Sequence, residues 1–217
     1  MKKVILLFLL FGQGLGALTA GDLLRDSADN RARISSYQAE VVTTVESPLA
    51  GRRVQQGLAY YQYPDRSRTD SFQPRQTVLK LADRVYTGAA GRVEELKNEA
   101  ALPAAFQQPE SLLARFDFQL ETAGQGWRLT GTPGSADPQD IFSSVYFTRL
   151  LLTLDENKNI TELSLYDDLA QEALNIKTVY AAVSGIAFPV RTEVFLRAAG
   201  LTAVTEYKNI RLNIPLA

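Results

Sequence analysis

Residues 146–167, "YFTRLLLTLDENKNITELSLYD", place the strongest constraint on what this chain can fold into. Leucines recur at every second position before the polar "DENKN" segment, and apolar residues recur again after it. A period of two is typical of a strand with one buried face, and two such runs around a polar turn predict an antiparallel hairpin. The residues expected to face one another across it are Leu150, Leu152 and Leu154 on one strand and Ile160, Leu163 and Leu165 on the other.

The same alternation runs through most of the chain. In "YQAEVVTTVE", Tyr37, Ala39 and Val41 fall on one face, while Gln38 and Glu40 fall on the other. Further short runs bounded by turn residues cover 54–63, 66–72, 76–83, 84–90, 116–122, 126–131, 174–183, 188–200 and 201–216. About 10–11 strands with short polar turns predict a mainly β protein whose antiparallel sheet curls toward a barrel.

Two segments interrupt this alternation. Residues 21–36, "GDLLRDSADNRARISS", carry Leu24 and two alanines at helical spacing after Asp22, which we expect to cap a short helix. Residues 94–116 are rich in Ala, Leu, Glu and Gln and are divided by two prolines. This composition predicts short helical pieces within an otherwise β protein.

Residues 1–20 have the features of a secretory signal. "MKK" is positively charged, "VILLFLLF" is apolar, and the small residues that follow offer cleavage near Ala17 or Ala20. The apolar run is much shorter than the roughly twenty residues of a membrane span. The chain contains no cysteine for a disulfide or a lipid anchor. We therefore expect a signal peptide over 1–20 and a single domain over 21–217, exported to the periplasm as an unanchored monomer.

The composition argues against an enzyme. Without His or Cys, the commonest acid–base residue, the usual nucleophile–base pairs and the standard zinc ligand sets are missing. Asp167, Asp168 and Glu172 lie close together in sequence. We interpret them as solvated charges at a turn, with a catalytic carboxylate pair or a calcium site as the alternative. We expect no cofactor and no metal.

Residues 57–72, "GLAYYQYPDRSRTDSF", raise the question of nucleic-acid binding. A platform for bases needs aromatic rings on one face beside a basic groove. Here two aspartates are interleaved with Arg66 and Arg68, and the whole chain has 23 basic against 24 acidic residues. This balance excludes a phosphate-binding surface and favours two strands joined by a turn at Pro64.

Four short motifs resemble the periplasmic lipoprotein carriers of the LolA type and their wider superfamily. They are a Ser-Ser-aromatic strand start at Ile34 to Tyr37, a proline followed by arginine at Pro64 to Arg68, a turn before an aromatic strand at Asp83 to Tyr86, and an Asp-rich hairpin at Asp155 to Leu165. The resemblance extends over nearly the whole exported part of the chain.

The resemblance implies an incomplete antiparallel barrel covered by helices, whose apolar interior shields the acyl chains of a lipid or lipoprotein. It also implies an inner-membrane donor and an outer-membrane acceptor as partners. The residues expected to line the acyl cavity are Tyr37, Val41, Leu58, Tyr60, Leu79 and Leu81. The residues expected in a lid over it are Leu102, Phe106, Leu112 and Leu113.

The sequence also departs from the carrier pattern. Tyr63 replaces the basic residue that commonly precedes the proline, and Arg84 stands where a glycine is expected. Ser67 and Thr69 occupy positions that are aromatic in the carriers. The alternative is therefore a non-catalytic periplasmic sensing or interaction module on the same fold, similar to the regulators that bind an anti-sigma factor.

Overall fold

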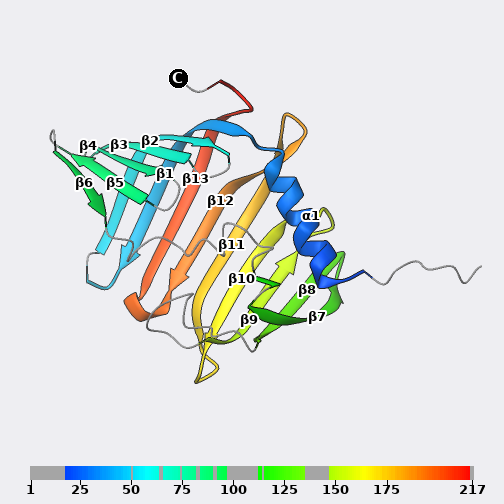
Figure 1. Cartoon of the computed structure of the whole chain (residues 1–217). Helices are drawn as coiled ribbons and strands as arrows, with labels where there is room; N and C mark the ends of the chain where they lie inside the picture. Colours follow the sequence, from blue (N-terminus) through cyan, green and yellow to red (C-terminus); the bar gives the residue numbers. More distant parts are fainter. Residues whose placement is uncertain are drawn as a thin grey trace, which may run out of the picture.

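The computed structural model describes residues 18–49, 51–63, 66–73, 75–81, 84–89, 92–96, 112–113, 115–134 and 147–215. These residues form a 13-stranded antiparallel sheet with the order β6-β5-β4-β3-β2-β1-β13-β12-β11-β10-β9-β8-β7 (Figure 1). The strands are β1 (Ser36–Ser47), β2 (Gly51–Gln62), β3 (Arg66–Phe72), β4 (Arg75–Leu81), β5 (Arg84–Ala89), β6 (Arg92–Leu96), β7 (Phe116–Ala123), β8 (Gly126–Pro133), β9 (Phe147–Leu154), β10 (Ile160–Asp167), β11 (Glu172–Val183), β12 (Ile186–Leu196) and β13 (Leu201–Leu212).

The pairing of β1 with β13 joins two runs of consecutive strands into one sheet. One run leads from β1 to β6 and the other from β7 to β13, so β6 and β7 lie at opposite edges. The sheet curls without closing, as Figure 1 shows. The predicted β class and the single curled antiparallel sheet are thereby confirmed.

The strand count exceeds the expected 10–11, and β6 shows why. Its residues Glu94 and Glu95 belong to the stretch whose composition predicted helix. In the structure they pair with Thr87 and Tyr86 of β5. Pairing with an existing strand edge overrides the weak helical preference of so short a segment. The helical prediction is therefore wrong for 94–96, and residues 97–111 lie outside the described part.

In the β9–β10 hairpin, the two sets of residues predicted to face one another do so. Leu150 is opposite Leu165, Leu152 opposite Leu163, and Leu154 opposite Ile160. Its polar turn is closed by Asp155, whose carboxylate accepts hydrogen bonds from the backbone N–H groups of two asparagines in the turn. Burial of the leucines on one face fixes this register, because a slip of one residue would turn them all to the other face.

The N-terminal helix α1 (Ala20–Ala32) has its cap three residues before the expected one, Asp22. Thr19 is the N-cap: its hydroxyl accepts a hydrogen bond from the Asp22 N–H at 3.1 Å, and the Asp22 carboxylate accepts from the Thr19 N–H at 3.1 Å. Asp22 is thus the acidic partner of a capping box and not the cap itself. The Thr19 hydroxyl also donates to the Asp22 carboxylate at 2.6 Å, and this bond, followed by the one from the Thr19 N–H, holds the pKa of Asp22 below its usual value.

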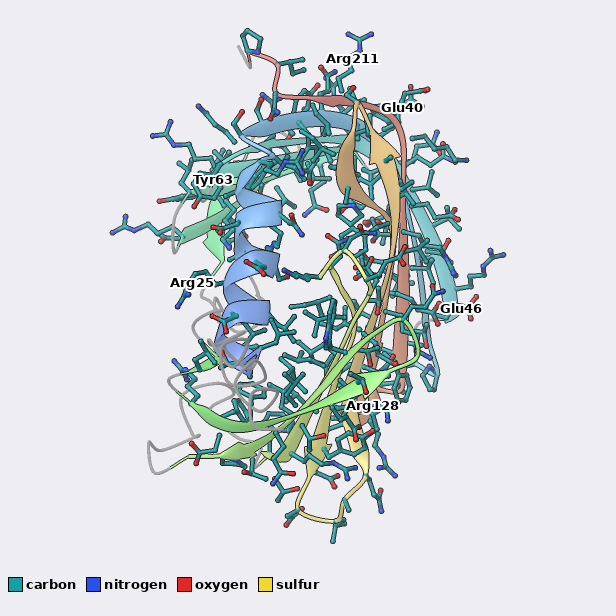
Figure 2. All side chains as sticks on the ribbon, turned by 90° about the vertical axis from the view of Figure 1, so that its right-hand side faces the viewer. Arg25, Glu40, Glu46, Tyr63, Arg128 and Arg211 are labelled. Atoms are coloured by element: carbon teal, nitrogen blue, oxygen red, sulfur yellow. The ribbon has the colours of Figure 1, made fainter. Side chains whose placement is uncertain are left out.

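The helix lies along the concave side of the sheet, which we call the inner face (Figure 2). One row of directly opposed residues follows this face across the sheet: Val45, Ala203, Val194, Ile176, Leu163, Leu152, Leu129 and Leu120. The opposite side is the outer face, on which Glu40 and Glu46 point away from α1 in Figure 2.

The hydrophobic core fills the inner face beneath α1. Leu23 and Leu24 of the helix are fully buried against leucines of β8 to β11. Leu112, in a short 3₁₀ turn before β7, joins this core with only 1% of its surface exposed. The predicted helix spacing found Leu24 but not Leu23. Within the described residues, α1 is the helix that covers the sheet, so the expected covering by several helices is not confirmed.

Polar contacts fasten α1 to the rest of the molecule. Asp26 forms an ion pair with Lys158 in the β9–β10 turn, and the Asn30 side chain donates to the Asn157 carbonyl at 2.7 Å. After the helix, the side chain of Asn213 accepts from the Ser35 N–H at 2.8 Å and donates to the Arg33 carbonyl at 3.0 Å. The helix is therefore held at its side and at its C-terminal end.

Candidate functional site

Four aromatic side chains meet on the inner face where the two runs of strands join. Tyr37 stacks on Tyr61 of β2, with ring centroids 5.4 Å apart and planes inclined by 23°. The edge of Phe188 from β12 meets Tyr37 at 5.1 Å, and Tyr207 of β13 contacts Phe188 at 5.7 Å. We call these four residues the aromatic cluster. Its packing brings together strands that are far apart in sequence, and offset or edge-on rings are the favoured geometries.

The tyrosine hydroxyls of the aromatic cluster are shielded from water. Burial, and then the neighbouring hydroxyl of Tyr207, raise the pKa of Tyr37 well above its usual value. Burial also raises the pKa of Tyr207, although its hydrogen bond with Tyr37 acts in the opposite direction. The hydroxyl groups of Tyr37 and Tyr207 therefore stay neutral at ordinary pH. They are polar groups in a cluster of otherwise apolar rings.

Beyond the aromatic cluster, one row of small side chains crosses the inner face of β2 to β5, with Gln76 and Lys80 of β4 on either side of it. Ala59 lies two residues before Tyr61 in β2 and is paired with Ala39 on one side and Thr69 on the other. Thr69 in turn is opposite Val78, and Val78 is opposite Thr87. The inner face thus changes from packed leucines under α1, through aromatic rings, to a row of small apolar and hydroxyl side chains between the polar residues Gln76 and Lys80.

Gly57 belongs to the same inner surface and is required by a close backbone approach. A Cβ atom at this position would lie 2.1 Å from the Asp70 carbonyl oxygen. Glycine is therefore the residue that allows β2 and β3 to approach this closely. It also keeps the inner face free of a side chain opposite Val41.

The six residues expected to line an acyl cavity are divided between the two faces. Tyr37 and Val41 lie on the inner face, the first in the aromatic cluster and the second buried. The other four lie on the outer face, because each is directly opposite a charged residue of that face: Leu58, Tyr60, Leu79 and Leu81. The structure does not bring the six residues together on one face, and a role in ligand binding stays a prediction for each of them.

The outer face of β2 to β4 is built around a carboxylate. Arg68 forms an ion pair with Asp70 at 2.9 Å, and Thr77 donates to the same carboxylate at 2.8 Å. The Arg68 guanidinium lies 5.9 Å from the ring centre of Tyr60. Burial raises the pKa of Asp70, but the bonds from Arg68 and Thr77 outweigh it and lower the pKa overall. Tyr60, Arg68, Asp70 and Thr77 thus form a surface network.

Only two of the four residues expected in a lid lie in the described part. Leu112 is a core residue beneath α1, whereas Leu113 is 40% exposed. Leu102 and Phe106 lie outside the described residues. Leu112 is therefore fixed in the core, which is unlike the movable cover that the sequence led us to expect.

The sequence reasoning missed three members of the aromatic cluster, namely Tyr61, Phe188 and Tyr207. The sequence did carry a signal for Tyr61. Tyr37 and Ala39 share one face of β1, and in the β1–β2 hairpin Tyr61 and Ala59 are the residues opposite them. The hairpin pairing of β1 with β2 would have selected Tyr61 and not Tyr60. Phe188 and Tyr207 depend on the distant pairing of β1 with β13, for which the sequence carries no local signal.

The described residues hold no group of three or more carboxylates that could bind a metal ion. Asp167 instead closes the β10–β11 turn by accepting from the N–H groups of Leu169 and Gln171. Glu172 accepts from the Asn175 side chain. The turn interpretation of these acidic residues is thereby supported. None of the described helices has the length and apolarity needed to cross a bilayer.

Solved structures with the same arrangement of strands are known. A DUF1329 family protein from Desulfovibrio piger superposes with a TM-score of 0.67 at 13% identity, over 91% of this chain and 93% of the other. A LolA superfamily protein from Nitrosomonas europaea superposes with a TM-score of 0.64 at 14% identity, over 92% and 96%. A Vibrio parahaemolyticus domain described as an outer membrane lipoprotein-sorting protein gives 0.62 at 13% identity, over 89% and 93%.

At the level of sequence, no family model and no curated protein matches this chain. The likeness therefore lies in the fold, and it extends over nearly the full length of each compared structure. This chain shares its fold with these three structures, among them a LolA superfamily protein.

Proposed function

We propose that this protein is a periplasmic carrier that binds the acyl chain of a lipid or lipoprotein on the inner face of its sheet and transfers it toward the outer membrane. It acts without catalysis, by non-covalent exchange with a donor and an acceptor. The LolA-superfamily fold supports the class of function. One observation supports the location of the site: a row of small side chains, Ala59, Thr69, Val78 and Thr87, crosses the inner face of β2 to β5 beside the aromatic cluster.

The physical basis is the difference between the two halves of the inner face. Under α1, leucines of the sheet and helix bury one another. Beside the aromatic cluster, residues such as Ala59, Thr69 and Val78 present short side chains. Each methylene of an acyl chain removed from water contributes about 0.8 kcal/mol, so a chain lying along this surface gains several kcal/mol.

Neighbouring residues of β4 provide a matched test. Val78 lies on the inner face and Leu79 on the outer face, and both are half-buried. We expect Val78→Trp to weaken binding of a fluorescent fatty acid at least about tenfold, equivalent to about 1.4 kcal/mol, because the indole occupies the acyl surface. Leu79→Trp is expected to change the affinity less than about twofold.

A second readout uses the two tryptophans directly. In a Trp127→Phe background, a brominated fatty acid should quench the fluorescence of the tryptophan at position 78 and leave that at position 79 unquenched. Circular dichroism and thermal unfolding of each variant check the fold. Equal quenching at both positions, or equal loss of affinity, would show that the acyl chain does not lie on the inner face.

Export of the chain follows from the same proposal, and the helix start favours one of the two expected cleavage points. Cleavage after Ala20 would remove Thr19, which caps α1. Cleavage after Ala17 would leave Leu18 at the N-terminus and keep the capping box intact. We therefore expect the exported protein to begin at Leu18, which N-terminal sequencing of the secreted chain would test.

A further inference from the structure

A polar pocket of about 370 Å³ lies between the C-terminal end of α1, the β9–β10 turn and the β11–β12 hairpin. Its volume is at the small end of the range of roughly 300–1,000 Å³ found for small-molecule sites. The polar residues that line it are Asn30, Arg33, Asp155, Asn157, Asn159 and Tyr180. Alanines and a glycine of the β11–β12 hairpin complete its wall. We call this site the polar pocket.

Several hydrogen-bonding groups of the polar pocket are left unused. Within the described part of the chain, the Tyr180 hydroxyl, the Arg33 guanidinium and the Asn157 side-chain amide have no hydrogen-bond partner in the protein, and Arg33 and Asn157 are exposed to solvent. Tyr180 is half-buried, and burial is the main cause that raises its pKa. Asn30 uses one amide N–H on the Asn157 carbonyl, which leaves its carbonyl oxygen available. The pocket therefore offers both donors and acceptors to a ligand.

The charges around the polar pocket oppose one another. Arg33 lines it, and Arg31 lies close enough to act on the Tyr180 hydroxyl. The negative charges near the pocket are the Asp155 carboxylate and the partial charge at the C-terminal end of α1. An anion would be repelled by one set and a cation by the other. A neutral ligand with many hydroxyl groups suits this setting, because each hydroxyl both donates and accepts.

The polar pocket adjoins the aromatic cluster. Ala181 lines the pocket and is paired directly with Phe188 across β11 and β12. Phe188 is 1% exposed and packs against Tyr37 and Tyr207. One pair of opposed residues therefore separates the polar pocket from the aromatic wall of the proposed acyl site.

From this geometry we propose that the polar pocket binds an uncharged, polyhydroxylated head group, so that the cargo is an amphiphile of the glycolipid class. The acyl chain of such a molecule would lie against the aromatic cluster while its sugar occupies the pocket. This inference deepens the proposed function and rests on it for the acyl part alone, because the pocket itself can be tested with a free sugar.

The experiment compares three probes below their micelle concentrations, octyl β-glucoside, octanol and octyl sulfate, by calorimetry and by amide NMR on the chain beginning at Leu18. We expect octyl β-glucoside to bind at least about tenfold more tightly than octanol, a difference of about 1.4 kcal/mol. It should shift the amide signals of Ala181, Ala187 and the Asn157 side chain. Octyl sulfate should gain no comparable advantage.

Variants with matched controls assign the effect to the polar pocket. Tyr180→Phe removes one hydroxyl, and Arg33→Ala removes the free guanidinium while leaving the backbone carbonyl that Asn213 binds. Each should reduce the affinity for octyl β-glucoside about threefold to tenfold and leave that for octanol unchanged. Tyr86→Phe on the outer face and Arg25→Ala, which points away from the sheet in Figure 2, should alter neither affinity.

The possible failures are distinguishable. Equal affinities for octanol and octyl β-glucoside without shifts in the pocket would overturn the head-group site and leave the acyl carrier standing. Tighter binding of octyl sulfate would overturn it in favour of an anion site. If no alkyl probe binds, the carrier function fails. The polar pocket is then tested with methyl β-glucoside alone. Shifts of the Ala181 and Ala187 amide signals would support sugar binding in the pocket, and unchanged spectra would overturn it.

Discussion

Tyr37 and Tyr61 stack face to face across β1 and β2, while Tyr60, the residue before Tyr61, lies on the opposite face beside Arg68. Two adjacent tyrosines of one motif therefore belong to different environments. One lies in a shielded aromatic wall, and the other covers an exposed ion pair. This division explains why the "YYQY" stretch fits neither a nucleic-acid platform nor a single ligand cavity.

Alkaline pH should destabilise the protein through the aromatic cluster. A tyrosine has an ordinary pKa near 10, and burial raises the pKa of Tyr37 and Tyr207 in the folded state. Their contribution is fully present below about pH 10 and is lost as the pH rises from there toward the folded-state pKa. Tyr37→Phe should flatten the fall of the urea midpoint above about pH 10. The exposed Tyr63→Phe is the control, and an equal change in both variants would contradict the prediction.

The ion pair between Asp26 and Lys158 should hold α1 in place only weakly. Both side chains are partly exposed, at 40% and 35%, so solvent screens their attraction. We expect Asp26→Asn to lower the free energy of unfolding by about 0.5 kcal/mol in low salt, and by less in high salt. Asp29→Asn, which removes an exposed carboxylate from the same helix, serves as the control. Urea unfolding at two salt concentrations measures both, and a loss independent of salt would assign the effect to packing.

Loss of the Thr19 hydroxyl should shorten or loosen the start of α1. The capping box depends on this hydroxyl, and an N-cap replaced by alanine typically costs about 1 kcal/mol. Thr19→Ala should therefore lower the free energy of unfolding by about that amount, whereas Thr19→Ser should retain the value of the parent chain. Chemical denaturation followed by circular dichroism distinguishes the two. Equal stabilities of the alanine and serine variants would rule out the cap as a source of stability.

Two leucines of similar sequence context should respond very differently to truncation. Leu152 is completely buried in the core under α1, whereas Leu81 is 41% exposed at the end of β4. Leu152→Ala should lower the free energy of unfolding by about 2–5 kcal/mol because it leaves a cavity. Leu81→Ala should cost less than about 1 kcal/mol. A large loss at Leu81 would mean that its surroundings are more tightly packed than its exposure indicates.

The sequence by itself determined the class of the fold and much of its local detail. Alternation identified most strands, and the register of Leu150 with Leu165 could be predicted because both residues belong to one hairpin with a short polar turn. The start of the helix was misplaced by three residues, since Thr19 and Asp22 are both good capping residues and only the backbone geometry distinguishes their roles. The assignment of 94–96 to helix failed because pairing with β5 decided the conformation.

Only the tertiary structure decided which face of the sheet is the inner one. In β2, Leu58 and Tyr60 are as apolar as Ala59 and Tyr61, so alternation separates two faces without saying which is buried. That choice follows from the pairing of β1 with β13 and from the position of α1, both of which join residues more than a hundred positions apart. The polar pocket arises in the same way, because Asn30, Asn157 and Tyr180 meet only once the helix rests on the curled sheet.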